Sequence, residues 1–147
     1  MYDIYLYGMI LKSNSFLLQN EYPEADTYGE IKERYCHTGG ETGTCATVLA
    51  SLGAKIKMDG NHMGKQTYPM IKAYYEEKDV DISALTYDEN YEGLEDFILI
   101  DQKTRTCFGT FNHYYSQDYK RWNKPQKSDI ENSKVIGLDP FFGEEAV

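Results

Sequence analysis

The segment Thr38-Gly39-Gly40-Glu41-Thr42-Gly43-Thr44 separates an alternating, strand-like pattern from a helical one, and it decides how this chain folds. Adjacent glycines allow the backbone to adopt positive φ angles and to approach another group closely. A helix that begins near Glu41 would present unpaired backbone N–H groups in its first turn, and such groups bind hydroxyls and anions. Many glycine-rich turns hold no ligand, so this segment alone predicts a strand-to-helix turn and leaves ligand binding open.

Two helices and a short strand are expected downstream of this turn. The first helix covers about residues 41–52, and Gly53 ends it. Its apolar side chains recur at helical spacing and predict one buried face: Cys45, Val48, Leu49 and Leu52. Residues 54–58 form a brief strand, and a second helix begins near Thr67 and ends near Lys78.

The remaining apolar runs predict strands on both sides of these helices. The predicted strands are residues 2–8, 10–18, 30–36, 94–100, 105–111 and 135–138. Those at 94–100 and 105–111 form a hairpin, and 135–138 is expected to be buried. Ser128 and Glu131 fit the capping box of a short helix, while 112–127 is polar and irregular. Strands interleaved with helices predict an α/β domain with a largely parallel sheet.

Length and charge limit the classes of partner. A chain of 147 residues is about one domain and is long enough to bury a real core. The chain has 15 Lys and Arg against 24 Asp and Glu, which gives a net charge of −9. Because such a surface repels phosphate backbones and anionic lipid headgroups, we expect neither a nucleic-acid partner nor a membrane partner.

The cysteines and the N-terminus indicate the compartment. Cys36, Cys45 and Cys107 are an odd number without a disulfide pattern, which favours a reducing, cytoplasmic setting. The first ten residues contain Asp3 and lack a basic flank, so they do not resemble a secretory signal. No run of 18 apolar residues predicts a membrane span.

Several familiar catalytic and metal-binding motifs are missing. Gly64-Lys65-Gln66 lacks the Ser or Thr of a P-loop, and no Gly-x-Ser-x-Gly elbow occurs. The loop that contains Asn61 is an ordinary turn or a loop that faces a ligand. The possible metal ligands have none of the usual pair spacings, so we expect no metal site: Cys36, His37, Cys45, His62 and His113.

The order of these features resembles the ribokinase-type (PfkB) carbohydrate kinase family. The features are Gly39-Gly40 before a helix, Leu52-Gly53-Ala54 after it, Gly60-Asn61-His62-Met63-Gly64, and then Asp79-Val80-Asp81-Ile82-Ser83 after the second helix. The hairpin with Phe97-Ile98-Leu99-Ile100-Asp101 and Arg105-Thr106 is similar to a strand pair that covers the sugar in that family. The resemblance spans nearly the whole chain but only the family's N-terminal half.

The resemblance implies a fold class: α/β, a partial ribokinase-like three-layer sandwich with a small β-sheet lid. Residues 1–147 would be the N-terminal portion of one kinase domain. The lid strands would lie at about 10–36 and 94–111, and the core pieces at about 1–8, 39–83 and 128–147. Since the last predicted strand has no covering helix after it, we expect the chain to be the first part of something larger.

The resemblance also implies an activity, the transfer of the ATP γ-phosphoryl group to a hydroxyl of a sugar or small polyol, with Mg²⁺. Family members usually have an Asp shortly after the glycine that ends the first strand, but none follows Gly8 here. Glu41 is then expected to accept the hydroxyl hydrogen bonds instead. The expected substrate-binding residues are Gly39, Gly40, Glu41, Thr44 and Asn61, with Ser13 as a further candidate.

The family's phosphoryl-transfer motifs do not occur in this sequence. The Gly-Ala-Gly-Asp stretch with the catalytic base and the Asn-x-x-Glu motif that organises Mg²⁺ are both absent. We therefore expect no catalytic residue and no nucleotide site on this chain. The expected partners are the family's C-terminal half and a second copy of the chain, which would bind through the lid strands. The alternatives are a non-catalytic sugar-binding or regulatory module and an inactive truncated fragment.

Overall fold

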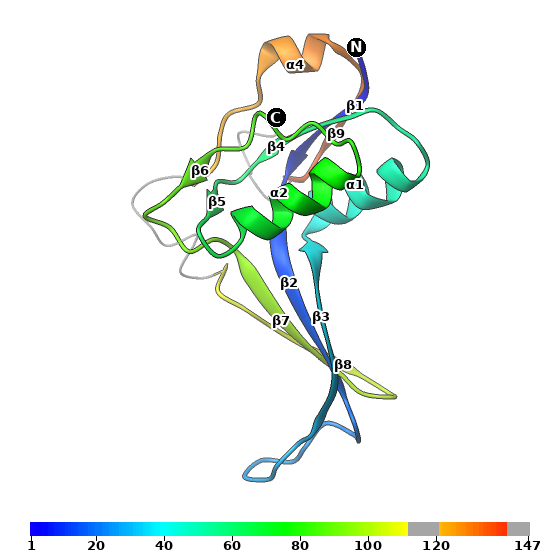
Figure 1. Cartoon of the computed structure of the whole chain (residues 1–147), viewed down its shortest axis with the longest axis vertical. Helices are drawn as coiled ribbons and strands as arrows, with labels where there is room; N and C mark the ends of the chain where they lie inside the picture. Colours follow the sequence, from blue (N-terminus) through cyan, green and yellow to red (C-terminus); the bar gives the residue numbers. More distant parts are fainter. Residues whose placement is uncertain (112–120, 141–147) are drawn as a thin grey trace.

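Strand β1 (Tyr2–Gly8) is the central strand of a three-stranded parallel sheet, with β4 (Ile56–Gly60) on one side and β9 (Ser133–Leu138) on the other (Figure 1). The structure is a computed structural model that describes residues 1–111 and 121–140. Ile4 is in register with both Ile56 and Val135. All three strands therefore end at the same edge of the sheet, where the chain leaves β1 at Gly8.

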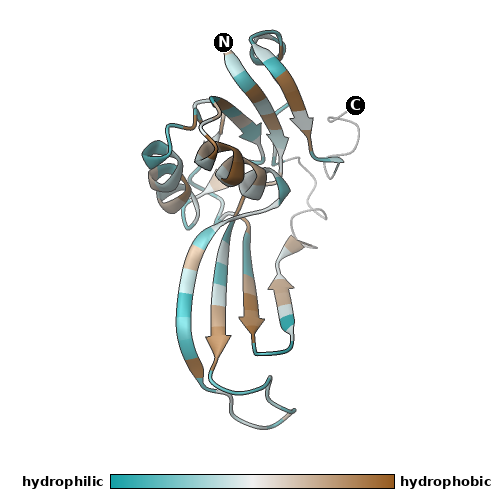
Figure 2. Ribbon diagram, turned by 90° about the vertical axis from the view of Figure 1, so that its right-hand side faces the viewer, coloured by the Kyte–Doolittle hydropathy of each residue, from teal (hydrophilic) through white to brown (hydrophobic). Residues whose placement is uncertain are grey.

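Helices α1 (Glu41–Ser51) and α2 (Tyr68–Glu77) lie on the same side of this sheet (Figure 2). They enclose the main apolar core, whose larger buried members are Leu6, Ile10, Ile56, Met58, Ile71 and Tyr75. Strand side chains that alternate toward this face meet helix side chains spaced at three to four residues, and this match fixes the packing. The opposite face packs Tyr5 and Tyr7 against Trp122 and against Ile130 of α4 (Lys127–Glu131).

A second, four-stranded sheet projects away from this body (Figure 1). Its strands, in spatial order, are β3 (Ile31–Gly39), β2 (Leu11–Leu18), β7 (Glu95–Ile100) and β8 (Arg105–Gly109). Hydrophilic and hydrophobic bands alternate along its ribbons, as expected for a sheet with two different faces (Figure 2). We call these four strands the lid sheet. The short strands β5 (Met63–Gly64) and β6 (Tyr87–Asp88) pair separately.

The order and type of the predicted helices and longer strands are confirmed. The short strands β5 and β6 were not predicted, β8 ends at Gly109 and not at residue 111, and two further predictions differ locally. Strand β3 continues to Gly39, so the sheet runs directly into the glycine pair instead of stopping at residue 36. The short helix at 127–131 is present, but Gln126 is its N-cap and no side chain caps it. The capping box predicted from Ser128 and Glu131 is therefore wrong, because Ser128 already lies inside the helix.

Two surfaces predicted to be buried are exposed. On α1, Val48 and Leu52 are 55% and 78% exposed and Cys45 is also exposed, while Leu49 packs against the core. On β9, Val135 and Leu138 are 55% and 46% exposed. Helical periodicity and a run of apolar residues show which side chains could be buried, but burial also needs a covering element, and none of the described residues supplies one.

Some predictions fall outside the described residues. The polar segment predicted at 112–127 is described only from residue 121 onward, so His113 is not placed. The end of the predicted core piece, residues 141–147, is likewise outside the described part of the chain.

Candidate functional site

Gly40 shapes the junction between the lid sheet and α1. Its φ angle is 82°, and a Cβ at this position would lie 2.4 Å from the carbonyl oxygen of Met9. Only glycine accommodates both the angle and the close approach. The same Met9 oxygen accepts hydrogen bonds from the backbone N–H groups of Thr42 and Gly43, at 3.2 and 3.3 Å. The prediction that the first turn of α1 offers free N–H groups is therefore wrong for these two residues, because the link between β1 and β2 occupies them.

The start of α1 is also fixed from the inside. The hydroxyl of Tyr75 in α2 donates a hydrogen bond to the carbonyl oxygen of Gly43 and lies 2.8 Å from the hydroxyl of Thr38. Burial raises the pKa of Tyr75 to about 12, so the phenol stays protonated and can donate. These bonds hold the end of β3, the start of α1 and the last turn of α2 in one arrangement.

An open cavity of about 750 Å³ lies between this junction and the lid sheet. Its lining residues come from the link after β1, the start of α1 and the hairpin of β7 and β8: Met9, Leu11, Gly40, Glu41, Thr44, Cys45, Asp96, Arg105 and Phe111. Three of the predicted site residues, Gly40, Glu41 and Thr44, are therefore brought together in one cavity. Apolar walls with a few carboxylate and hydroxyl groups are typical of a site for a small polar molecule.

Glu41 and Thr44, three positions apart in the first turn of α1, both line the cavity. Both are exposed, and the side chain of Glu41 forms no hydrogen bond or ion pair with any described residue. A carboxylate at a helix N-terminus also interacts favourably with the helix dipole, so its presence there has a structural explanation as well. In addition, Glu41 lines a cavity that is large enough for a small molecule.

Ser13 reaches the cavity through another residue. Its side chain is only 2% exposed, and its hydroxyl donates a 2.5 Å hydrogen bond to Oδ1 of Asp96. Asp96 itself lines the cavity, as does Arg105 from the paired strand. Neither is among the predicted substrate-binding residues, although Arg105 belongs to the hairpin that was expected to cover the sugar. The sequence does show that Asp96 lies next to the apolar run Phe97–Ile100. Only the strand pairing shows on which face of the sheet its side chain lies.

Gly39 and Asn61 are buried behind the cavity. A Cβ at Gly39 would lie 2.9 Å from Cδ1 of Leu11, so the glycine lets β2 and β3 pack closely. The side-chain amide of Asn61 accepts a 2.7 Å hydrogen bond from the N–H of Ile10 and donates a 2.9 Å bond to its carbonyl. Neither residue lines the cavity, and direct contact of either with a ligand stays a prediction.

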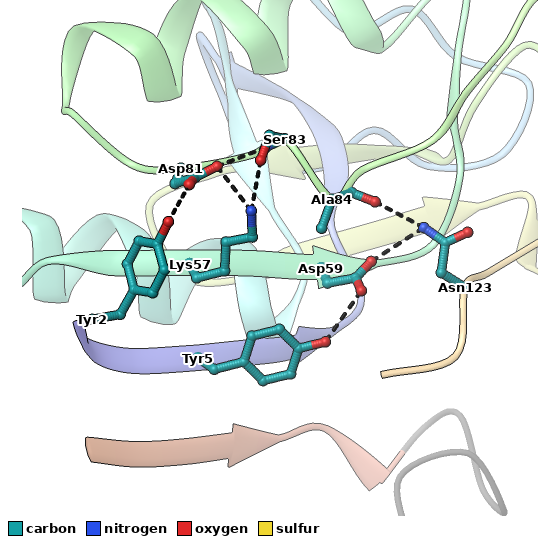
Figure 3. Close-up of polar contacts among 8 residues, drawn as sticks. All are labelled: Tyr2, Tyr5, Lys57, Asp59, Asp81, Ser83, Ala84 and Asn123. Carbon is teal, nitrogen blue, oxygen red and sulfur yellow. Dashed lines mark hydrogen bonds and ion pairs between the residues drawn. The ribbon is translucent and has the colours of Figure 1, made fainter. Parts of the chain in front are cut away.

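A buried polar cluster joins β1, β4 and the segment that follows residue 120 (Figure 3). The carboxylate of Asp59 accepts hydrogen bonds from the hydroxyl of Tyr5 at 3.1 Å and from the amide of Asn123 at 3.2 Å. Burial raises the pKa of Asp59, although these bonds and one from the N–H of Gly60 oppose the shift. The amide of Asn123 also donates to the carbonyl of Ala84. This cluster fixes the end of β4 and is separate from the cavity.

A second cluster ties the start of β1 to the loop after α2 (Figure 3). Asp81 accepts hydrogen bonds from the hydroxyl of Tyr2 and from the ammonium of Lys57, the latter at 3.1 Å. Burial alone would raise the pKa of Asp81, but bonds from Tyr2, Ser83 and Lys57 outweigh it and hold the pKa well below its usual range. The same bond raises the pKa of Tyr2 to about 12. The cluster is structural, because none of its members lines the cavity.

Two kinds of feature are absent from the described ranges 1–111 and 121–140. No three His, Cys, Asp or Glu side chains come together there as a metal site would require. Within the same ranges, no helix combines the length and apolar character needed to cross a bilayer.

Comparison with known proteins identifies the fold. No family model and no curated protein matches the sequence. A search of solved structures finds a nucleoside kinase of Methanocaldococcus jannaschii, an archaeal member of the ribokinase family, which is 22% identical, with a TM-score of 0.71 over 97% of this chain and 46% of that one. A putative ribokinase from Agrobacterium tumefaciens is 18% identical, with a TM-score of 0.78 over 94% of this chain and 44% of that one.

A third structure was solved with ligands. It is Arabidopsis thaliana ribokinase in complex with ribose and ATP, which is 12% identical, with a TM-score of 0.69 over 93% of this chain and 45% of that one. This chain therefore spans less than half the length of each of these structures. At such identities the likeness establishes the fold, and it confirms the α/β, ribokinase-like fold class expected from the sequence.

Proposed function

We propose that this chain, which has the fold of ribokinase-family carbohydrate kinases over less than half their length, is the substrate-binding part of a kinase for a sugar or small polyol. In the complete protein, the γ-phosphoryl group of ATP would be transferred to a hydroxyl of the bound molecule. Such catalysis depends mostly on positioning and on charge stabilisation around the phosphoryl group. The part assigned to this chain is to hold and orient the acceptor.

The observation that carries the proposal is the cavity between Gly40-Glu41 and the lid sheet. It places carboxylate and hydroxyl side chains (Glu41, Thr44 and Asp96) around one space of about 750 Å³, with apolar residues from two different parts of the chain as walls. A polyol offers many hydroxyl donors and apolar C–H faces, and both would find partners here. The solved structures with this fold include a ribokinase complexed with ribose and ATP.

We assign ATP and Mg²⁺ to polypeptide other than this chain. In phosphoryl-transfer sites, Mg²⁺ binds to one or two carboxylates together with the phosphate oxygens, so we place it with the nucleotide. The cavity contains one basic side chain, Arg105, and the backbone N–H groups of Thr42 and Gly43 are already bonded. These residues do not fit a triphosphate, so no step of the transfer is assigned to them.

Two exposed apolar surfaces support a further part of the same domain. Val48 and Leu52 of α1 are exposed, and β9 is an edge strand with exposed side chains on both faces, Val135 on one and Ile136 and Leu138 on the other. Parallel strands are normally covered on both faces. The proposed cover is the C-terminal half of the kinase, with further strands beside β9 and helices over its faces.

The lid sheet is proposed to pair with a second copy of the chain. Phe97 and Phe108 lie opposite each other on β7 and β8 and are 38% and 49% exposed. Strand alternation puts them on the face away from Asp96 and the cavity, together with Phe16 and Leu99. An aromatic face on a projecting sheet is suited to self-association.

A cytoplasmic location, expected from the cysteines, is part of the proposed function as well.

The alternative is a binding or regulatory module without catalysis, favoured by the absence of the family's catalytic-base motif from the sequence. The intact gene product separates the two functions. With ATP, Mg²⁺ and ribose, fructose or adenosine, a kinase forms ADP only when one of these acceptors is present. A module binds an acceptor in calorimetry without forming ADP.

The isolated chain provides the second half of the test. We expect calorimetry to detect binding of at least one of the three acceptors and no binding of ATP. ATP binding by residues 1–147 alone would contradict the assignment of the nucleotide site. If none of the three acceptors binds to the isolated chain or to the intact gene product, the proposal itself is wrong.

A further inference from the structure

We propose that Asp96, held in place by Ser13, is the carboxylate that accepts hydrogen bonds from the hydroxyls of the bound molecule. The inference rests on the proposed function, since it concerns the same cavity, and it names a residue that the sequence analysis did not consider. The chain has no acidic residue between Gly8 and Ser13, and Asp96 is one of two carboxylate residues that line the cavity.

The pairing of two strands brings the carboxylate there. Ser13 on β2 lies in register with Asp96 on β7, so both side chains lie on the same face of the lid sheet. That face contributes Leu11, Asp96 and Arg105 to the cavity wall. The sequence between Gly8 and Ser13 contains no acidic residue, but β7 delivers one beside Ser13 from more than 80 positions further along the chain.

The hydrogen bond from Ser13 leaves half of the carboxylate available. The Ser13 hydroxyl donates to Oδ1 of Asp96 at 2.5 Å, whereas Oδ2 accepts no hydrogen bond from any described residue. Asp96 forms no ion pair in the described part of the chain. A hydrogen bond to a carboxylate is strong and fixes its orientation. Ser13 thus aims Oδ2, and the free oxygen can accept a hydroxyl hydrogen from a ligand in the cavity.

The neighbouring residue, Glu95, is a carboxylate with a structural role in the same strand. Glu95 precedes Asp96 and points to the opposite face, where it forms a 2.6 Å ion pair with Lys12. Asp is disfavoured in strands, and the four residues after Asp96 are all apolar. Asp96, in contrast, has no cationic partner among the described residues, and it lines a cavity. A ligand that supplies hydrogen-bond donors accounts for this difference.

The test uses the intact gene product with whichever of ribose, fructose or adenosine supports ADP formation. Asp96→Asn keeps an oxygen that can accept the Ser13 bond, so the fold should persist while the charged acceptor is lost. We expect kcat/KM to fall at least tenfold, roughly the cost of a hydrogen bond to a charged group, mostly through KM. The matched control is Glu95→Gln, which removes the same charge from the other face and should change kcat/KM less than about twofold.

A double-mutant cycle tests the positioning role of Ser13. Ser13→Ala alone should lower kcat/KM by about threefold to tenfold, and it should add little in the Asp96→Asn background, because Ser13 acts through Asp96. Additive losses would show that Ser13 does not act through Asp96. For a deoxy acceptor that lacks the contacted hydroxyl, Asp96→Asn should lower kcat/KM little relative to the wild-type protein.

The outcomes separate this inference from the proposed function. Normal kcat/KM for Asp96→Asn, with acceptor-dependent ADP formation intact, would overturn the role of Asp96 and leave the proposed function standing. If the gene product binds acceptors but forms no ADP, the dissociation constants of the same variants in calorimetry replace kcat/KM. If the wild-type protein binds none of the three acceptors, both proposals fail together.

Discussion

Gly40 shows how one residue sets the position of the cavity. Its positive φ and its contact with the Met9 carbonyl let β3 run directly into α1 beneath the link between β1 and β2. A glycine pair is visible in the sequence, but the sequence does not show which of the two glycines adopts a positive φ. In the structure Gly40 has the positive φ, while Gly39 is required for packing against Leu11.

Gly40→Ala should destabilise the chain by about 2–4 kcal/mol, because the new Cβ meets both a left-handed backbone and the Met9 carbonyl at 2.4 Å. Urea unfolding measures the loss. The matched control is Gly53→Ala, where φ is 83° but no atom lies within 4 Å of the Cβ, so only the backbone penalty of about 1 kcal/mol remains. Equal losses for the two variants would show that the contact with Met9 is not restrictive.

Glu41→Ala tests the second carboxylate of the cavity. In the intact gene product kcat/KM for the acceptor should fall at least tenfold, because a hydroxyl loses a charged acceptor. Steady-state kinetics with the active acceptor provide the measurement. Glu77→Ala, at the exposed end of α2, is the control and should leave kcat/KM unchanged. Unchanged kinetics for Glu41→Ala would remove Glu41 from the site and leave Asp96 as the carboxylate in contact with the acceptor.

Among the elements, β1 depends on polar contacts at its start as well as on its apolar core. Tyr2, Lys57 and Asp81 connect β1, β4 and the loop after α2 (Figure 3). The sequence shows Asp81 only as one of several acidic residues near the end of α2, which are typically solvated. Its partners Tyr2 and Lys57 come from two strands elsewhere in the chain, so its role is decided by tertiary contacts.

Asp81→Asn should alter the pH dependence of unfolding. The pKa of Asp81 is below its usual range in the folded chain, so its stabilisation is present above pH 4 and is lost as the pH falls further. Urea unfolding between pH 3 and 7 should show a loss of roughly 1 kcal/mol at pH 7 and a smaller difference at pH 3. Asp79→Asn, an exposed position with φ 55° that Asn also adopts, is the control. A difference between Asp81→Asn and wild type that does not change with pH would contradict the linkage.

The strands expected to form the lid do form one sheet, but the sequence did not predict which of them are neighbours or in what register they pair. The strands at 10–18 and 94–100 are visible as apolar runs with turn residues between them. Their parallel pairing is not visible, because it joins segments more than 80 residues apart. That pairing is what places Asp96 beside Ser13, so the missed site residue follows directly from the missed pairing.

At the scale of the whole molecule, two apolar surfaces remain uncovered by the described residues. Changing Val48 on α1 and Val135 on β9 to lysine tests what covers them. In the isolated chain the double variant should be more soluble and should bind less of a hydrophobic dye, because exposed apolar area is reduced. In the intact gene product the same double variant should lower the free energy of unfolding by several kcal/mol, because lysines would be buried. Equal effects in both proteins would argue against a covering half.

Self-association through the lid sheet is a second property of the whole molecule. Replacing both Phe97 and Phe108 by serine should shift a dimer toward monomer in sedimentation experiments, since the pair is exposed on the face away from the cavity. Acceptor binding should be unchanged, because neither residue lines the cavity. Tyr28→Ser, an exposed aromatic outside the sheet, is the control. A wild-type monomer at all concentrations would contradict the pairing.

The sequence by itself determined the succession of strands and helices, the glycine pair that opens α1 and the resemblance that indicated a ribokinase-like fold. These depend on local backbone preferences and on periodicity, which are properties of neighbouring residues. Tertiary structure alone decided that Asp96 and Arg105 join Glu41 in one cavity, that Asn61 bonds the backbone of Ile10, and that Val48 and Val135 stay exposed. Those outcomes depend on which distant strands pair and on what covers each face, and neither is encoded in the pattern of any single segment.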